Sequence, residues 1–169
     1  MGKTRIAREI TINAPRHDVW KALSDFGHVE NLNPNIASSH LTSLRKSGIG
    51  ITRHCDLTAL GATLEERVTE WKEDAYMAVD AYDFENLDTL KEMHEYFWLE
   101  EDGAKTILKG TLEYKLSEDI GSVMNELVIE RINIKRWIEL LAGTKKYVET
   151  HTPVDRTAVL HTEEVRTLL

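Results

Sequence analysis

The feature that most constrains this chain is a long amphipathic segment near its C-terminal end. Between residues 120 and 149, apolar side chains recur at helical spacing and form one stripe, made of Val123, Leu127, Ile134, Ile138, Leu141 and Val148. Charged residues such as Glu130 and Lys135 lie beside this stripe. A helix of about thirty residues is roughly 45 Å long. It must therefore lie across most of a sheet to bury its apolar side.

The segments before this helix alternate between strand-like runs and turns. Residues 4–12 place Ile6, Ile10 and Ile12 on one face of a period-two pattern, which predicts a half-buried first strand. Turn residues divide the later part into six more predicted strands, over residues 36–46, 49–58, 63–72, 76–82, 89–100 and 105–116. The Asp102-Gly103 pair predicts a hairpin between the last two. Short connections favour antiparallel pairing of successive strands.

Two short helices are predicted between the first two strands. Pro15 suits the first turn of a helix, and the apolar residues that follow it at helical spacing are Val19, Trp20, Leu23 and Phe26. Gly27 is expected to end this helix, and a second one is expected over residues 28–32. The whole pattern predicts an α+β domain over residues 1–150, with a curved seven-stranded antiparallel sheet wrapped around the long helix. Residues 151–169 contain Pro153 and a weak helical pattern, and are expected to form a tail.

Composition narrows the possible partners and compartment. The chain has 21 Lys and Arg against 29 Asp and Glu, a net charge of −8, which is the wrong sign for binding nucleic acid or anionic membrane surfaces. Cys55 is the single cysteine, so a reducing, cytoplasmic location is expected. Residues 1–12 lack an apolar signal segment, and no later run is long enough for membrane insertion.

The sequence also lacks the motifs of several enzyme classes. No dinucleotide-binding glycine pattern, phosphate loop or nucleophile-elbow serine occurs, so no cofactor is expected. His54, Cys55 and Asp56 are consecutive on a predicted strand, where side chains alternate between faces, and are not expected to share a metal ion. We therefore expect no metal site.

Three stretches of the chain resemble the START/Bet v 1-like (SRPBCC) superfamily, and within it the polyketide cyclase/dehydrase family. They are ITINAP at residues 10–15 with the following Val19-Trp20, GIGITR at 48–53 leading to EERV at 65–68, and GTKKYVE at 143–149. The resemblance covers residues 4–149. It implies a helix-grip fold with a cavity between the sheet and the C-terminal helix. Because this superfamily includes carriers, receptors and enzymes, the resemblance implies a fold rather than one activity.

Three functions are compatible with this resemblance. The preferred one is binding of a small hydrophobic or aromatic ligand in the cavity, as in lipid transport. The second is an aromatase/cyclase-type enzyme that folds or dehydrates a polyketide-like substrate. The third is an interaction adaptor that docks a protein partner through residues 151–169 or through an exposed aromatic face. A monomer and a homodimer both fit the sequence.

Charged residues on the strand over residues 63–72 are the first candidate site. Glu65 and Arg67 share one face, and the resemblance places Arg67 inside. Glu65 would then lie about 7 Å away along the strand, so both could fix the polar end of a ligand. In an enzyme, Arg67 would stabilise an enolate oxygen. The alternative is a solvated charge pair on an exposed face.

The strand over residues 89–100 has two possible inner faces, because both carry aromatic residues. One face consists of Met93, Glu95, Phe97 and Leu99, and the other of His94, Tyr96 and Trp98. Matching the following hairpin to the family favours the first face inside. That orientation would bury Glu95, whose carboxyl would then tend to stay protonated and could act as a general acid. A register shifted by one residue would place Glu95 in water instead.

Two further candidates come from single polar residues. His54 is a possible acid or base, although core or surface roles are commoner for a histidine on a strand. Arg131 interrupts the apolar stripe of the long helix, and could contact an anionic ligand or extend to the cavity rim, which we favour. The remaining wall and core are expected to consist of Trp20, Leu108, Leu112, Tyr114, Leu127, Ile134 and Ile138.

Overall fold

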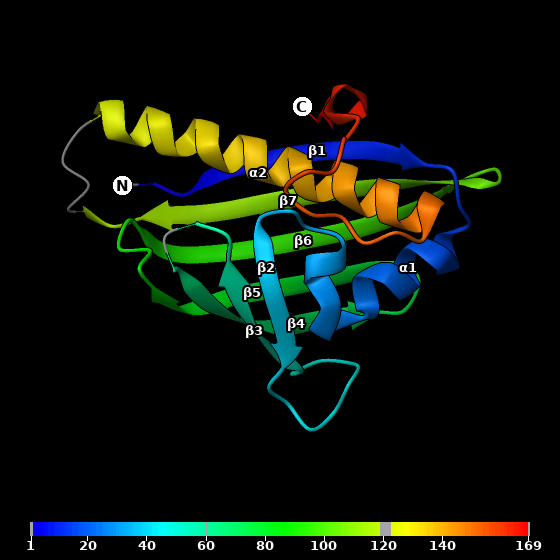
Figure 1. The fold of residues 1–169 in the computed structure, drawn as a ribbon, viewed down its shortest axis with the longest axis horizontal. Helices are drawn as coiled ribbons and strands as arrows, with labels where there is room; N and C mark the ends of the chain where they lie inside the picture. The colour runs from blue at the N-terminus through cyan, green and yellow to red at the C-terminus, as the bar shows by residue number, and fades with distance from the viewer. Residues whose placement is uncertain (1, 60, 119–122, 169) are drawn as a thin grey trace.

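The computed structural model describes residues 2–59, 61–118 and 123–168, and its main element is an antiparallel sheet (Figure 1). Neighbouring strands follow the order β2-β3-β4-β5-β6-β7-β1-β8. The strands are β1 (Thr4–Ile12), β2 (Ile36–Leu41), β3 (Thr52–Leu57), β4 (Thr63–Lys72), β5 (Tyr76–Glu85), β6 (Leu90–Asp102), β7 (Lys105–Leu116) and β8 (Arg166–Thr167). β2 to β7 pair in sequence order, as predicted, and β1 pairs antiparallel with β7 along its whole length.

Turn residues set the ends of the strands. The strands predicted over residues 36–46 and 49–58 are shorter in the structure, because a loop over residues 42–51 separates β2 from β3. Gly48 and Gly50 in this loop have φ angles of +88° and +89°, a conformation that favours glycine and interrupts an extended strand. The predicted β6–β7 hairpin is confirmed: Asp102 pairs with Lys105, and Gly103 in the turn has a φ of +62°.

Two short helices lie beside the C-terminal half of the long helix (Figure 1). They are α1 (Arg16–Ser24) and the 3₁₀ helix η1 (Phe26–Asn31). Trp20 of α1 packs edge-on against Trp71 of β4, with 5.0 Å between the ring centroids. α1 ends before Gly27, the residue predicted to end it. Gly27 instead lies buried in η1, where an added Cβ would come within 2.9 Å of the Leu41 Cγ.

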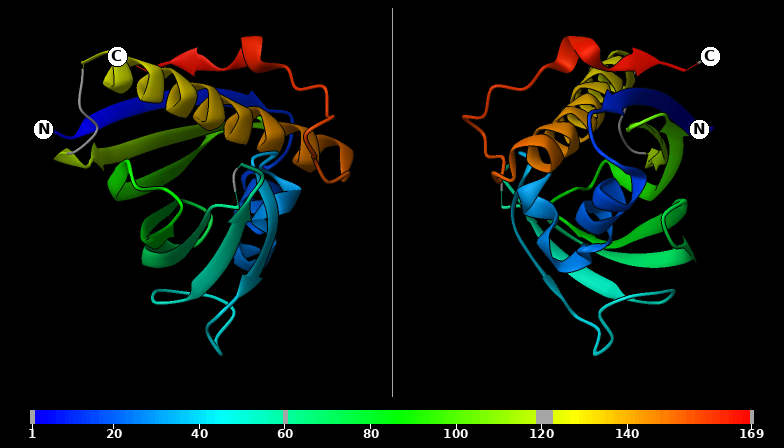
Figure 2. Two further views of the ribbon diagram at one scale, coloured as in Figure 1. Left: turned by 60° about the vertical axis from the view of Figure 1, so that its left-hand side comes forward. Right: turned by 90° about the vertical axis from the view of Figure 1, so that its right-hand side faces the viewer.

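The long helix α2 (Val123–Thr150) lies across the open side of the curved sheet (Figures 1 and 2). Its predicted start at residue 120 lies outside the described residues. The buried part of α2 is its C-terminal half, where the Trp137 ring lies 5.5 Å from the Phe97 ring and Trp137 Nε1 donates a hydrogen bond of 3.2 Å to the Gly110 carbonyl. Within the described residues, no helix carries an apolar stretch long enough to span a membrane.

Residues 151–168 fold back from the end of α2 and reach the outer edge of β1 (Figure 2). Val154 is buried, and its backbone N–H donates a hydrogen bond of 3.0 Å to the Asn31 carbonyl. Further along, Glu164 lies 3.4 Å from the Lys145 Nζ of α2. β8 then pairs with β1. The sheet therefore has eight strands, one more than the seven predicted, because residues expected to form only a tail supply the last one.

Candidate functional site

A cavity of about 490 Å³ lies between the sheet, η1 and α2. Inner-facing side chains of β3 to β7 form one wall, and η1 with the loop after it forms another. α2 closes the remaining side. Most lining residues are apolar, and the aromatic ones are Phe26, Phe97 and Trp137. A cavity of this size and composition suits a small, mainly apolar molecule.

Four residues that line the cavity are also exposed to solvent. Asn86, Asp88 and Thr89 belong to the β5–β6 loop, and Ile132 belongs to α2. The mouth of the cavity therefore lies between this loop and the N-terminal half of α2. Asn86 Nδ2 donates a hydrogen bond of 3.1 Å to the Gly61 carbonyl, which ties the β5–β6 loop to the β3–β4 turn.

An arginine and a glutamate form a buried ion pair on the cavity wall. Arg53 of β3 and Glu66 of β4 are directly opposite in the strand register, and their side chains are hydrogen-bonded through the Arg53 Nε. Arg53 Nη1 also donates a hydrogen bond of 3.1 Å to the Phe26 carbonyl. Its guanidinium carbon lies 3.9 Å from the centroid of the Phe26 ring, a cation–π contact. These contacts fix both the position and the charge of Arg53.

Glu95 of β6 is the third ionisable residue on the inner face of the sheet, and it is only 8% exposed. Burial, reinforced by the Glu66 carboxylate and opposed by Arg53, raises the pKa of Glu95 to about 8. Within the described part of the chain, its carboxyl forms no hydrogen bond to another residue. At neutral pH, Glu95 is therefore mainly a protonated carboxylic acid that faces the cavity.

Cys55 is buried behind these residues. Its Sγ lies 3.6 Å from Glu66 Oε2, to which the thiol can donate a weak hydrogen bond. Burial raises the pKa of the Cys55 thiol well above its usual range. Because the thiolate is the reactive form, Cys55 is poorly suited to act as a nucleophile.

The predicted orientation of β6 is confirmed. Met93, Glu95 and Phe97 line the cavity, while Leu99 is buried next to it in the core. On the neighbouring strand β7, Leu112 lines the cavity as predicted, whereas Leu108 is fully buried in the core and does not reach the lining.

The predicted orientation of β4 is wrong. Arg67 is exposed on the outer face, where its guanidinium carbon lies 4.8 Å from the centroid of the Tyr82 ring. Glu65, on the same face, is hydrogen-bonded to His54 Nδ1. The physical reason is that Leu64 and Val68 are the apolar residues of β4, so burying them turns the even-numbered face inward.

His54 also lies on the outer face, away from the cavity. Its Nδ1 is paired with Glu65, and its Nε2 lies 3.3 Å from Asp56 Oδ1. The hydrogen bond to Glu65 is the main cause of the raised pKa of His54. His54, Glu65 and Tyr82 line a shallow hollow on this outer face. The structure therefore separates His54 and Arg67 from Glu95, although all three were candidates for one site.

The face of α2 that lines the cavity differs from the predicted one. Leu127 and Arg131 are exposed, and Ile134 is half-buried against the core; none of them lines the cavity. The lining residues of α2 are Ile129, Ile132, Asn133, Arg136, Trp137 and Leu140. Their spacing follows a helical repeat, so a stripe that includes polar Asn133 and Arg136 would have identified this face from the sequence.

Arg53 and Glu66 were missed by sequence reasoning, although a signal for them exists. Ile51, Cys55 and Leu57 alternate on the same face as Arg53, and Leu64 and Val68 flank Glu66 in the same way. A charged residue inside such an apolar period-two run points to a buried charge. Because the two runs pair as neighbouring strands, this pattern predicts an ion pair.

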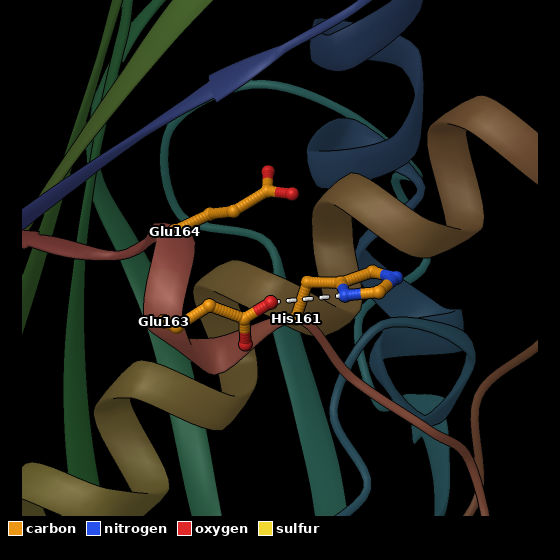
Figure 3. A group of neighbouring side chains, drawn as sticks. All are labelled: His161, Glu163 and Glu164. Carbon is orange, nitrogen blue, oxygen red and sulfur yellow. Dashed lines mark hydrogen bonds and ion pairs between the residues drawn. The ribbon is translucent and has the colours of Figure 1, made fainter.

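A separate polar group lies on the segment after α2 (Figure 3). His161, Glu163 and Glu164 are exposed, with potential ligand atoms within 4.8 Å of one another. His161 Nδ1 lies 3.1 Å from Glu163 Oε1, while Glu164 is paired with Lys145. The three residues are thus engaged in local ion pairs on the surface, and we assign no metal ion to them.

Comparison with known proteins identifies relatives of this architecture. The sequence profile of the family described as "Polyketide cyclase / dehydrase and lipid transport" matches residues 3–149. No curated protein matches the chain by sequence.

Solved structures share the fold at low sequence identity. TTHA0849 from Thermus thermophilus has a TM-score of 0.74 at 16% identity, over 88% of this chain and 99% of that one. Ara h 8.0201 has a TM-score of 0.70 at 15% identity, over 88% and 99%. A START superfamily protein from Mycobacterium smegmatis has a TM-score of 0.69 at 16% identity, over 89% and 100%. The helix-grip fold is thus shared with START and Bet v 1-like proteins, and the family profile spans nearly the whole chain. The chain belongs to the polyketide cyclase/dehydrase and lipid transport family.

Proposed function

We propose that this protein binds a small hydrophobic or aromatic molecule in the cavity beneath α2. The observation that carries the proposal is a mainly apolar cavity of about 490 Å³, on whose wall three buried ionisable residues lie together. These residues are Arg53, Glu66 and Glu95. Sites of about 300–1,000 Å³ with a few placed polar groups are typical of small-molecule binding. A cytoplasmic location is part of the proposal, because a chain with one cysteine forms no intramolecular disulfide.

The positions of the lining residues orient the ligand. Its polar end lies near the Glu95 carboxyl, and its apolar body packs against Phe97 and Trp137. Its outer end lies at the mouth formed by the β5–β6 loop. This arrangement differs from the one predicted from sequence, because Arg53 and Glu66 take the places expected for Arg67 and Glu65.

The first test is native mass spectrometry of freshly purified protein, to detect a bound molecule that denaturation releases. The second is titration with Nile red, an uncharged fluorescent dye, against wild type and a cavity-filling variant. Met93→Trp introduces a larger side chain into the cavity and should weaken dye binding at least about tenfold, since the lost volume excludes the ligand. Tyr96→Trp, on the outer face of the same strand, is the matched control and should bind as wild type does. Equal affinity in all three proteins would contradict binding in this cavity.

A second candidate function is supported by the protonation of Glu95. A carboxylic acid that remains protonated near neutral pH can donate its proton to the hydroxyl of a β-hydroxy ketone, which leaves as water when the C–O bond breaks. The α-carbon then gives its proton to the resulting Glu95 carboxylate, which forms the C=C bond and restores the acid. Of the three catalytic candidates, Glu95 is therefore the one that fits this reaction, while Arg67 and His54 lie on the outer face. Incubation with short β-hydroxy aryl ketones, with Glu95→Gln as the comparison, tests it: loss of turnover in the variant supports the enzyme, and equal rates with both proteins exclude this role.

A further inference from the structure

The charges around Glu95 can be counted from each element that contributes to the cavity. β3 provides Arg53 and the thiol of Cys55, and β4 provides Glu66. α2 provides Arg136 and the β5–β6 loop provides Asp88, one cation and one anion. The lining residues from η1, β5 and β7 are uncharged, and no histidine is among the described residues of the lining. With Glu95 protonated, the buried charges of Arg53 and Glu66 sum to zero.

Arg53 is the buried cation that an anionic ligand would need, but two of its three guanidinium nitrogens already have partners. Its Nε is bound to Glu66, its Nη1 to the Phe26 carbonyl, and one face of its guanidinium lies on the Phe26 ring. An anion placed beside Arg53 would also lie beside the Glu66 carboxylate. Since an uncompensated charge is strongly disfavoured in a buried site, a carboxylate or phosphate has no favourable position there.

The Glu95 carboxyl, in contrast to the Arg53 guanidinium, is available to a ligand. It is buried and faces the cavity, and within the described residues it has no hydrogen-bond partner. A protonated carboxyl donates one strong hydrogen bond, and the acceptor that leaves the charge balance unchanged is an uncharged oxygen.

We propose that the buried end of the ligand is an uncharged group with an accepting oxygen, such as a ketone or ester carbonyl, and that the cavity rejects carboxylates and phosphates. This inference rests on the proposed binding function and specifies the ligand class for the same site. The Glu95 carboxyl donates its proton to the ligand oxygen in a hydrogen bond, while Arg53 and Glu66 remain paired. Free fatty acids are thereby excluded, and their neutral esters or aromatic ketones are accepted.

The experiment compares two probes of one shape, 2-acetylnaphthalene and 2-naphthoate, by displacement of Nile red from the full chain at pH 7. The ketone should bind at least about tenfold more tightly than the carboxylate. Because Glu95 has a pKa of about 8, the affinity for the ketone should fall as the pH rises from 7 to 9, since the donor loses its proton.

Two matched variants assign the effect to Glu95. Glu95→Gln keeps a hydrogen-bond donor without a titrating proton, so it should bind the ketone and remove the dependence on pH. Glu92→Gln removes a carboxylate that pairs with Lys3 and does not line the cavity, and it should retain the wild-type profile.

The results separate this inference from the proposed function. Equal affinity for 2-naphthoate and 2-acetylnaphthalene, or a profile in Glu95→Gln that still falls between pH 7 and 9, would overturn the inference while leaving ligand binding established. Failure of wild type to bind Nile red and both probes would overturn the binding function itself.

Discussion

Arg53 and Glu66 face each other across β3 and β4, and both side chains are more than nine-tenths buried on the inner face of the sheet. Neighbouring β2 and β5 continue the sheet on either side, and Phe26 covers the guanidinium. Neither charge can be solvated by bulk water in this position. Removing either charge therefore leaves the other buried without a counter-ion, which strongly destabilises the folded chain.

The first prediction concerns removal of one partner of this pair. Glu66→Gln leaves the Arg53 charge buried without its counter-ion and should lower the free energy of unfolding by about 3 to 5 kcal/mol. Urea denaturation, monitored by circular dichroism, measures this loss in the free energy of unfolding. The control is Glu100→Gln, which removes the exposed Lys109–Glu100 contact of 2.7 Å and should cost under about 1 kcal/mol. Similar small losses in both variants would mean that the buried pair is solvated.

The second prediction is a pH dependence of stability caused by Glu95. Its pKa rises from 4.5 to about 8 on folding, so between these values the folded chain binds more protons at this site than the unfolded chain. The contribution of Glu95 to stability is therefore fully present below pH 4.5 and is lost as the pH rises through about 8. The steepest slope for one group is about 1.4 kcal/mol per pH unit. Subtracting the Glu95→Gln profile from that of wild type isolates this slope, and a flat difference would show that Glu95 is ionised in the folded state.

The third prediction concerns the close approach of α2 to the end of η1. A Cβ at Gly143 would lie 2.0 Å from the backbone oxygen of Leu32. In an ordinary helix, Gly→Ala increases stability by up to about 1 kcal/mol. Gly143→Ala should instead destabilise the protein by about 1 to 3 kcal/mol, because backbone must move to relieve the overlap. Thermal unfolding shows whether the Gly143→Ala variant is less or more stable than wild type. An increase in Tm would show that α2 does not pack this closely.

The fourth prediction tests the corrected orientation of β4. Arg67→Ala removes a side chain from the outer face, where its main neighbour is the Tyr82 ring. The affinity for Nile red and for the ketone probe should stay within about twofold of wild type, since the cavity lining is unchanged. Isothermal titration calorimetry measures both constants. A tenfold loss would instead place Arg67 in the binding site.

The fold could be predicted because its signals are repeated along many residues. The six successive strands and the long helix each rest on several apolar positions, so one ambiguous residue changes little. The inner face of β6 was predicted only by matching the hairpin at Asp102-Gly103 to the family. Periodicity alone does not choose between the two faces of this strand, because both carry aromatic residues.

The site was harder to predict because its charged residues interrupt the apolar alternation that marks the buried face of each strand. Glu66 and Arg53 are charged residues on the buried face, while Glu65 and Arg67 are charged residues on the exposed face. Charge therefore does not distinguish the two faces of β4, and only the apolar neighbours Leu64 and Val68 do. The lining face of α2 is similarly obscured, since Asn133 and Arg136 lie among its apolar residues. Residues 151–168 give only a weak periodic signal because they pack through isolated contacts such as Val154.

The pairing of β1 with β7 has a consequence for how the chain acquires its structure during synthesis. Residues 4–12 are made before the other strands, but their sheet partner over residues 106–114 emerges from the ribosome about a hundred residues later. β2 to β6 can pair with neighbours as they emerge, whereas β1 exposes its apolar face until β7 follows. The nascent chain therefore exposes an unpaired, aggregation-prone strand until β7 has been made. Joining β1 to the rest of the sheet, and with it closing this wall of the domain, is a late event that waits for residues 106–114.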